Sequence, residues 1–194
     1  MNELNPIDHI AHELLLQLKA AEPAKPYAAA IYCQKDDKII AQSINEEFAN
    51  QSPIAHAEIN VIHAVAPQLF RAKDPRNEEF YREFHLFVST RPCPMCTAAI
   101  VESGISSVSF FYENNYKKEI AEKIIAAKYA GRPFTFQAIH SRWEAIFWAI
   151  SEKKCKSMPE AVEYALAHAG GLSRMLLIEP GAKEQEDYDR YCPF

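Results

Sequence analysis

Four side chains in two short stretches of the sequence could carry out chemistry. The stretch HAE places His56 and Glu58 two residues apart, and the stretch RPCPMC places Cys93 and Cys96 three residues apart. Two cysteines at that spacing, at the start of a helix, present both sulfurs on one face near amide groups that favour thiolates. With His56 they form a Cys2His set, which is typical of catalytic zinc with one open position. We therefore expect these three residues to bind zinc.

Glu58 is expected to be the proton carrier of this site. At about 100° per residue, two residues that are two positions apart lie on opposite sides of a helix. They can face one cleft only if both stand at the leading end of the helix. There His56 can hold the metal while the Glu58 carboxylate takes a proton from the water and returns it to the substrate. The spacing excludes the H-E-x-x-H site of metalloproteases, which requires two histidines four residues apart.

Each motif also has a plainer interpretation. A single histidine is most often a packed or surface residue, and a C-x-x-C pair in a reduced protein can bind metal, perform redox chemistry or do neither. A thioredoxin-like redox pair is the main rival, because the motif follows a predicted strand and begins a predicted helix. Redox chemistry would leave the H-x-E stretch without a role, so the two motifs together favour a zinc hydrolase.

The order H-x-E and then P-C-x-x-C is that of zinc-dependent nucleobase deaminases. The sequence resembles the cytidine and deoxycytidylate deaminase superfamily over roughly residues 5–155. Its motifs are most similar to those of the guanine deaminase, tRNA-adenosine deaminase and fungal-type cytosine deaminase branches. The resemblance implies that His56, Cys93 and Cys96 bind zinc and that Glu58 moves protons during hydrolytic deamination.

The same resemblance implies which residues contact the substrate. It assigns the side chain of Asn45 to a hydrogen bond with the base or its sugar, and the backbone N–H of Ala57 to the ring carbonyl. We expect a free nucleobase or nucleoside as substrate, with a purine such as guanine slightly favoured. Cytosine, cytidine and deoxycytidylate are the alternatives. Arg91 departs from the pattern, because guanine and tRNA-adenosine members usually carry glutamate at this position.

The charge of the chain argues against nucleic acid as a partner. The 194 residues have a formal net charge of −5, and a lysine cluster at residues 117–123 alternates with glutamates, as on a solvated helix face. Deamination of adenosine in tRNA nevertheless stays open as an alternative. A catalytically silent zinc scaffold subunit is the alternative from a different class, and the intact Glu58 counts against it.

The sequence and the family resemblance also indicate a compartment and an oligomeric state. The first 25 residues lack a secretory pattern and the chain has five cysteines, which favours a reducing compartment, so we expect a cytoplasmic protein. No stretch approaches the roughly 18 apolar residues that a membrane helix needs. The family resemblance implies a homodimer.

The elements that must position these residues alternate along the chain. Apolar patterns predict strands at residues 27–33, 38–44, 84–90, 105–112 and 133–139. Helices are predicted at residues 6–18, from about Ser52-Pro53 to Pro67, and at 92–104, 116–131 and 141–154. This alternation predicts an α/β domain at residues 1–156, and the family resemblance makes it a three-layer α/β/α sandwich with a mixed sheet of about five strands. Residues 157–194 are predicted to form a C-terminal helical and loop extension.

Overall fold

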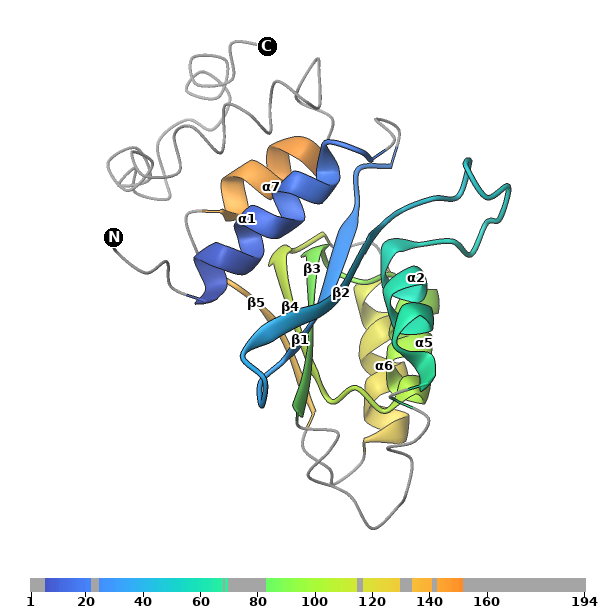
Figure 1. The fold of residues 1–194 in the computed structure, drawn as a ribbon. Helices are drawn as coiled ribbons and strands as arrows, with labels where there is room; N and C mark the ends of the chain where they lie inside the picture. The colour runs from blue at the N-terminus through green and yellow to red at the C-terminus, as the bar shows by residue number, and fades with distance from the viewer. Residues whose placement is uncertain are drawn as a thin grey trace, which may run out of the picture.

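The fold is built on one five-stranded sheet, as the computed structural model shows (Figure 1). The structure describes residues 6–21, 25–67, 69, 83–114, 117–129, 134–140 and 143–151. The strands are β1 (Ala28–Cys33), β2 (Lys38–Ile44), β3 (Phe84–Thr90), β4 (Ser107–Tyr112) and β5 (Thr135–Ala138). They lie in the spatial order β2-β1-β3-β4-β5. The five predicted strands are therefore confirmed, with small differences at their ends.

The sheet is mixed, as predicted. β1 pairs antiparallel with β2 and with β3, whereas β3, β4 and β5 run parallel to one another. β1 and β2 form the predicted hairpin around the turn at residues 34–37. β3 and β4 are buried along nearly their whole length, which explains why most of their residues are apolar and do not strictly alternate with polar ones.

Five helices cover the two faces of the sheet in the described part of the chain. They are α1 (Pro6–Leu18), α2 (Ala57–Ala64), α5 (Pro94–Ser103), α6 (Lys118–Lys128) and α7 (Glu144–Ser151). α1 and α7 lie on one face, and α2, α5 and α6 lie on the other (Figure 1). This arrangement confirms the three-layer α/β/α sandwich. None of these helices is long and apolar enough to cross a membrane.

The predicted start of the second helix is wrong. Ser52 and Pro53 begin a turn in which the N–H of Ala55 donates to the carbonyl of Ser52 at 3.1 Å. Proline suits the second position of such a β-turn as well as the first turn of a helix. α2 begins only at Ala57, with His56 as its N-cap residue. The predicted extension at residues 157–194, and the domain boundary before it, lie outside the described residues.

Each face of the sheet has its own hydrophobic core. On one face, the apolar stripe of α1 packs with Trp143 and Phe147 at α7. On the other, Val61 of α2 and Ile100 of α5 pack against strand side chains such as Leu86. Full burial of one such side chain stabilises the fold by about 2 kcal/mol. The second core matters most for function, because it fixes α2 and α5 side by side.

His85 is a polar residue within this sheet. Its Nε2 lies 2.8 Å from the hydroxyl of Ser109 on β4, and its ring stacks on that of Phe87 with 4.1 Å between centroids. Burial lowers the pKa of His85 to about 4. The ring is therefore neutral in the fold at neutral pH.

We predict that His85 makes the fold sensitive to acid. Because its pKa is lower in the folded state than the roughly 6.5 of an unfolded chain, the unfolded state binds more protons between these values. The neutral His85 ring contributes at most about 3 kcal/mol to the free energy of unfolding. This contribution is fully present above about pH 6.5 and is lost as the pH falls toward 4. Denaturant unfolding at pH 7 and at pH 4.5 measures it.

The variant His85→Gln should lose less stability than the wild type over this pH interval. His140→Gln is the matched control, because His140 lies on the surface with its side chain 84% exposed. Equal losses of unfolding free energy in the wild type and in His85→Gln would contradict the assignment.

Candidate active site

The leading ends of α2 and α5 meet on one face of the sheet. His56 is the N-cap residue of α2 and Cys93 is the N-cap residue of α5, and both have extended backbone. Cys96 lies in the first turn of α5, which begins shortly after β3 ends. The two helices contact each other, so these three side chains are carried to one place. This placement explains how His56 and Glu58 can serve one site although they are only two residues apart.

The three predicted metal ligands converge. Nδ1 of His56 lies 3.4 Å from Sγ of Cys96 and 3.8 Å from Sγ of Cys93. All three donor atoms lie within 4.8 Å of one another. One imidazole nitrogen and two thiolates match zinc in softness and in number for a site with three protein ligands. The donor set therefore fits the zinc ion that the sequence predicts.

The two thiols have different proton affinities. The hydrogen bond from Cys96 is the main cause that lowers the pKa of Cys93 to about 4, and a hydrogen bond with His56 adds to it. The same contact between the sulfurs, together with burial, raises the pKa of Cys96 far above its usual range. Cys93 therefore gives up its proton more readily than Cys96. A divalent metal that binds both sulfurs must displace the proton of Cys96.

Glu58 lies beside this cluster, as the second residue of α2. Its side chain is buried, and burial raises the pKa of its carboxyl group, in opposition to a hydrogen bond from its own backbone N–H. The carboxyl also interacts with the thiol of Cys96. Burial thus lets this carboxyl group hold a proton to a higher pH than an ordinary glutamate, which favours a role as general acid and base.

The predicted substrate contacts lie at the edge of the same site. Asn45 directly follows β2 and is only 1% exposed. Its Oδ1 accepts a hydrogen bond from the N–H of Glu47 at 3.2 Å, and its Nδ2 lies 3.4 Å from the Glu47 carboxylate. Ala57 is the first residue of α2, so its N–H has no acceptor within the helix. Their predicted roles toward a base stay predictions.

Glu47 is a residue of the site that the sequence analysis missed. Its Oε1 lies 2.6 Å from Nε2 of His56, the ring nitrogen that does not face the sulfurs. Burial would raise the pKa of Glu47, but hydrogen bonds from Lys25 and Asn45 and the charge of His56 together lower it. The sequence holds little signal for this contact, because Glu46 stands next to Glu47 and their spacing from His56 does not distinguish them.

Arg91 links neighbouring elements near the site. Its guanidinium group pairs with Glu113, just after β4, at 2.8 Å and with Glu122 of α6 at 3.5 Å. The guanidinium also lies over the rings of Phe110 and Phe136, at 5.4 and 5.0 Å from their centroids. Arg91 is buried and joins the ends of β3 and β4 to α6. The positive charge of Arg91, at the position where relatives usually carry glutamate, is thus paired with the carboxylates of Glu113 and Glu122.

Within the described ranges, the other histidines lie outside the group of donor atoms that includes His56. His63, near the end of α2, is exposed and is not part of the group of donor atoms that could hold a metal. Among the described residues, one group of His, Cys, Asp and Glu side chains has donor atoms close enough for a metal, and it consists of His56, Cys93 and Cys96.

Sequence comparison with known proteins agrees with this site. The model of a family described as "Cytidine and deoxycytidylate deaminase zinc-binding region" matches residues 5–112, which is more than half of the chain. A tRNA-specific adenosine deaminase from Buchnera aphidicola subsp. Baizongia pistaciae (strain Bp) is 35% identical over 77 residues. The alignment covers 39% of this chain and only 42% of that relative.

Solved structures share the fold. One, from a study of A-to-I editing by tRNA:A34 deaminases, has a TM-score of 0.55 and 21% identity, and covers 72% of this chain and 98% of that chain. A guanine deaminase from Nitrosomonas europaea has a TM-score of 0.50 and 17% identity, with 80% and 82% covered. At these identities the likeness concerns the fold alone. By the family match and by its fold, the chain belongs to the cytidine and deoxycytidylate deaminase family.

Proposed function

We propose that this protein is a zinc-dependent hydrolytic deaminase that acts on a free nucleobase or nucleoside and releases ammonia. One observation supports the proposal above all others. The imidazole of His56 and the sulfurs of Cys93 and Cys96 meet at the ends of two helices, beside the buried carboxyl group of Glu58. The membership of a deaminase family adds the reaction class.

His56, Cys93 and Cys96 would hold the zinc ion. When bound, zinc supplies a Lewis acid that makes water reactive near neutral pH. In the overall reaction, water adds to the ring carbon that carries the amino group, and ammonia leaves from the same carbon. Glu58 takes a proton released by the water, passes it to the ring nitrogen, and then assists the departure of ammonia. Its raised pKa suits both directions of transfer.

Asn45 and the N–H of Ala57 would orient the ring. Among the described residues, the contacts of the Asn45 amide with Glu47 use one of its two N–H groups and one lone pair of its oxygen. One donor and one acceptor position then remain for a base or its sugar. A purine such as guanine is slightly favoured as substrate, with cytosine, cytidine and deoxycytidylate as alternatives.

The proposal includes a homodimer in the cytoplasm. The family resemblance supports the homodimer. The odd number of cysteines in the chain, five, supports a reducing compartment.

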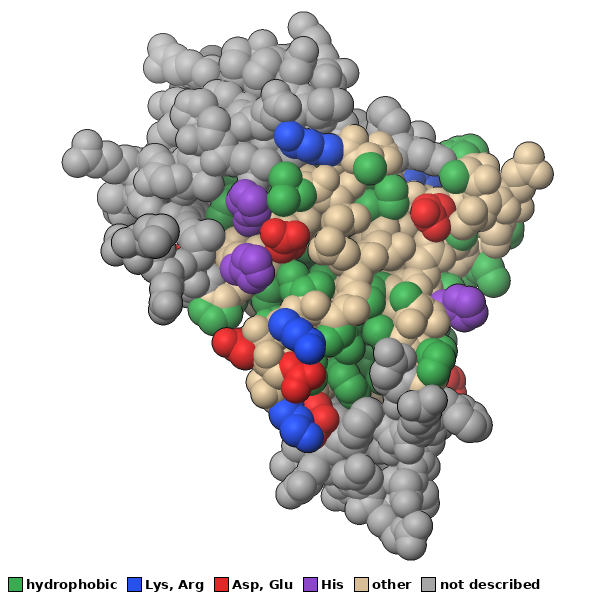
Figure 2. All heavy atoms as spheres, in the orientation of Figure 1, with side chains coloured by type: hydrophobic (Ala, Val, Ile, Leu, Met, Phe, Trp, Pro, Cys, Tyr) green, Lys and Arg blue, Asp and Glu red, His purple; other side chains and the backbone are tan. Residues whose placement is uncertain are grey.

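Deamination of adenosine in tRNA is a second candidate function. It is favoured by the 35% identity with a tRNA-specific adenosine deaminase. The net charge of −5 opposes it, since phosphate contacts require clustered lysine and arginine. On the face of the molecule in Figure 2, the described lysine and arginine side chains are mixed with aspartate and glutamate.

The two candidates are separated by measuring ammonia release. We expect release from at least one of guanine, adenine, cytosine, their nucleosides and deoxycytidylate, and none from tRNA. We also expect tRNA binding to be weak and to vanish as salt rises toward physiological ionic strength. Release of ammonia from tRNA, together with inactivity on every small substrate, would favour the second candidate.

The role of Glu58 is tested by the substitution Glu58→Gln. Because the amide cannot accept and return a proton, we expect ammonia release to fall by roughly 100- to 10,000-fold. The zinc content should stay at the wild-type level, since Glu58 is not among the ligands. Metal analysis and turnover on the best substrate measure the two effects.

Glu102→Gln is the matched control for this substitution. Glu102 lies near the far end of α5, where it pairs with Lys128 at 3.1 Å, and its removal should leave turnover unchanged. Wild-type turnover in Glu58→Gln would refute the proton-carrier role.

A further inference from the structure

The ring of His56 is held at both of its nitrogens. Nδ1 faces the sulfurs of Cys93 and Cys96, whereas Nε2 lies 2.6 Å from Oε1 of Glu47. These contacts come from different parts of the chain, because the cysteines lie at the start of α5 and Glu47 lies in the loop between β2 and α2. The imidazole is therefore fixed between two independent elements.

The chemistry of these contacts determines where the ring proton lies. A neutral imidazole has one N–H donor and one acceptor nitrogen. A glutamate carboxylate only accepts hydrogen bonds, so the proton belongs on Nε2, which donates to Glu47. With a proton fixed on Nε2, Nδ1 is the nitrogen whose lone pair is left for a metal. This is the tautomer that a metal ligand at Nδ1 requires.

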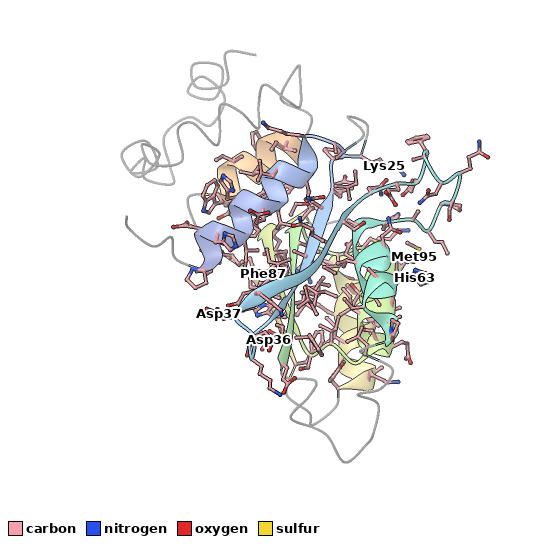
Figure 3. The ribbon with its side chains drawn as sticks, in the orientation of Figure 1. Lys25, Asp36, Asp37, His63, Phe87 and Met95 are labelled. Atoms are coloured by element: carbon pink, nitrogen blue, oxygen red, sulfur yellow. The ribbon has the colours of Figure 1, made fainter. Side chains whose placement is uncertain are left out.

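Glu47 is itself held in place from several sides. Its other oxygen, Oε2, pairs with the ammonium group of Lys25, on the segment before β1 (Figure 3). The amide of Asn45 contacts its Oε1, and its own N–H donates to Asn45. The Glu47 side chain is only 11% exposed, compared with 38% for Lys25. The carboxylate thus has a fixed position before any ligand reaches the site.

We propose that Glu47 is the positioning residue of the zinc site: it sets the tautomer and orientation of His56, and Lys25 and Asn45 anchor it. The proposal rests on the proposed zinc site, because it needs a metal at Nδ1. A carboxylate on the remote nitrogen of a histidine ligand also raises the basicity of the ligating nitrogen. Glu47 therefore acts through His56 and does not itself contact the metal or the substrate.

Solvent limits how much the loss of Glu47 can weaken zinc binding. The His56 side chain is 24% exposed, so water can replace part of the lost contact when Glu47 is removed. Partners of this kind typically change metal affinity by roughly 10- to 100-fold. An amide at the same place can still accept the hydrogen bond, but it lacks the negative charge.

Zinc affinity measured by chelator competition tests the proposal. We expect Glu47→Ala to bind zinc roughly 100-fold more weakly than the wild type, and Glu47→Gln roughly 10-fold more weakly. Binding of Co²⁺ read from its absorption bands gives a second readout, and the band positions report the orientation of the ligands. A residue that served stability alone would lower the unfolding temperature and leave the affinity of the folded protein unchanged.

Glu46 supplies the matched control. It stands next to Glu47 but accepts hydrogen bonds from Asn50 and Asn60 instead of from His56. Glu46→Ala and Glu46→Gln should bind zinc with wild-type affinity.

The outcomes are distinguishable. If the wild type binds no zinc, the proposed function fails. If the wild type binds zinc and Glu47→Gln binds it within about twofold of the same affinity, the positioning role is overturned while the zinc site stands. Glu47→Gln alone decides the matter if Glu47→Ala does not fold.

Discussion

The packing of α2 and α5 against one face of the sheet is the constraint on which the site depends. Both helices bury apolar side chains in the core that also contains side chains of β1, β3 and β4, and they contact each other. Their leading ends therefore meet, and each end contributes a residue that lies just outside the helix, His56 or Cys93. Free N–H groups and the positive ends of two helix dipoles point to the same small volume. Such a place favours thiolates and carboxylates.

Without a cation, gathering thiolates and a carboxylate in this small volume would cost free energy, because their negative charges repel one another. Two thiols and the buried carboxyl of Glu58 compete for protons, which separates the pKa values of Cys93 and Cys96 widely and raises that of Glu58. A divalent metal relieves this competition because it binds sulfurs in place of protons. The chain thus combines soft donor atoms with a buried carboxyl group at their side, and the proposed hydrolysis of a C–N bond in an aromatic ring uses both.

Much of the fold and of the candidate site could be predicted from the sequence, because the signals for them lie within short stretches of the chain. The apolar runs fixed the strands because β3 and β4 are buried along nearly their whole length, and Gly104 ended α5 as expected, with a left-handed backbone. The two motifs that are proposed to hold zinc were recognisable because each stands at the start of a helix. The start of α2 was mistaken because proline suits a β-turn and a helix start equally well.

Glu47 could not have been found in this way. Its contact with His56 depends on how the loop between β2 and α2 folds back, where the N–H of Glu46 donates to the carbonyl of Ala55 at 2.9 Å. It also depends on Lys25, which is 22 residues away in sequence. No periodicity or spacing encodes such an arrangement. The same is true of Arg91, whose partners Glu113 and Glu122 come from later elements.

Zinc-edge X-ray absorption of the purified protein tests the central claim most directly. We predict one zinc per chain, bound by two sulfurs at about 2.3 Å and one imidazole nitrogen at about 2.0 Å, with the fourth coordination position filled by no side chain. Absence of zinc, a site closed by four side chains, or a disulfide between Cys93 and Cys96 would contradict the account.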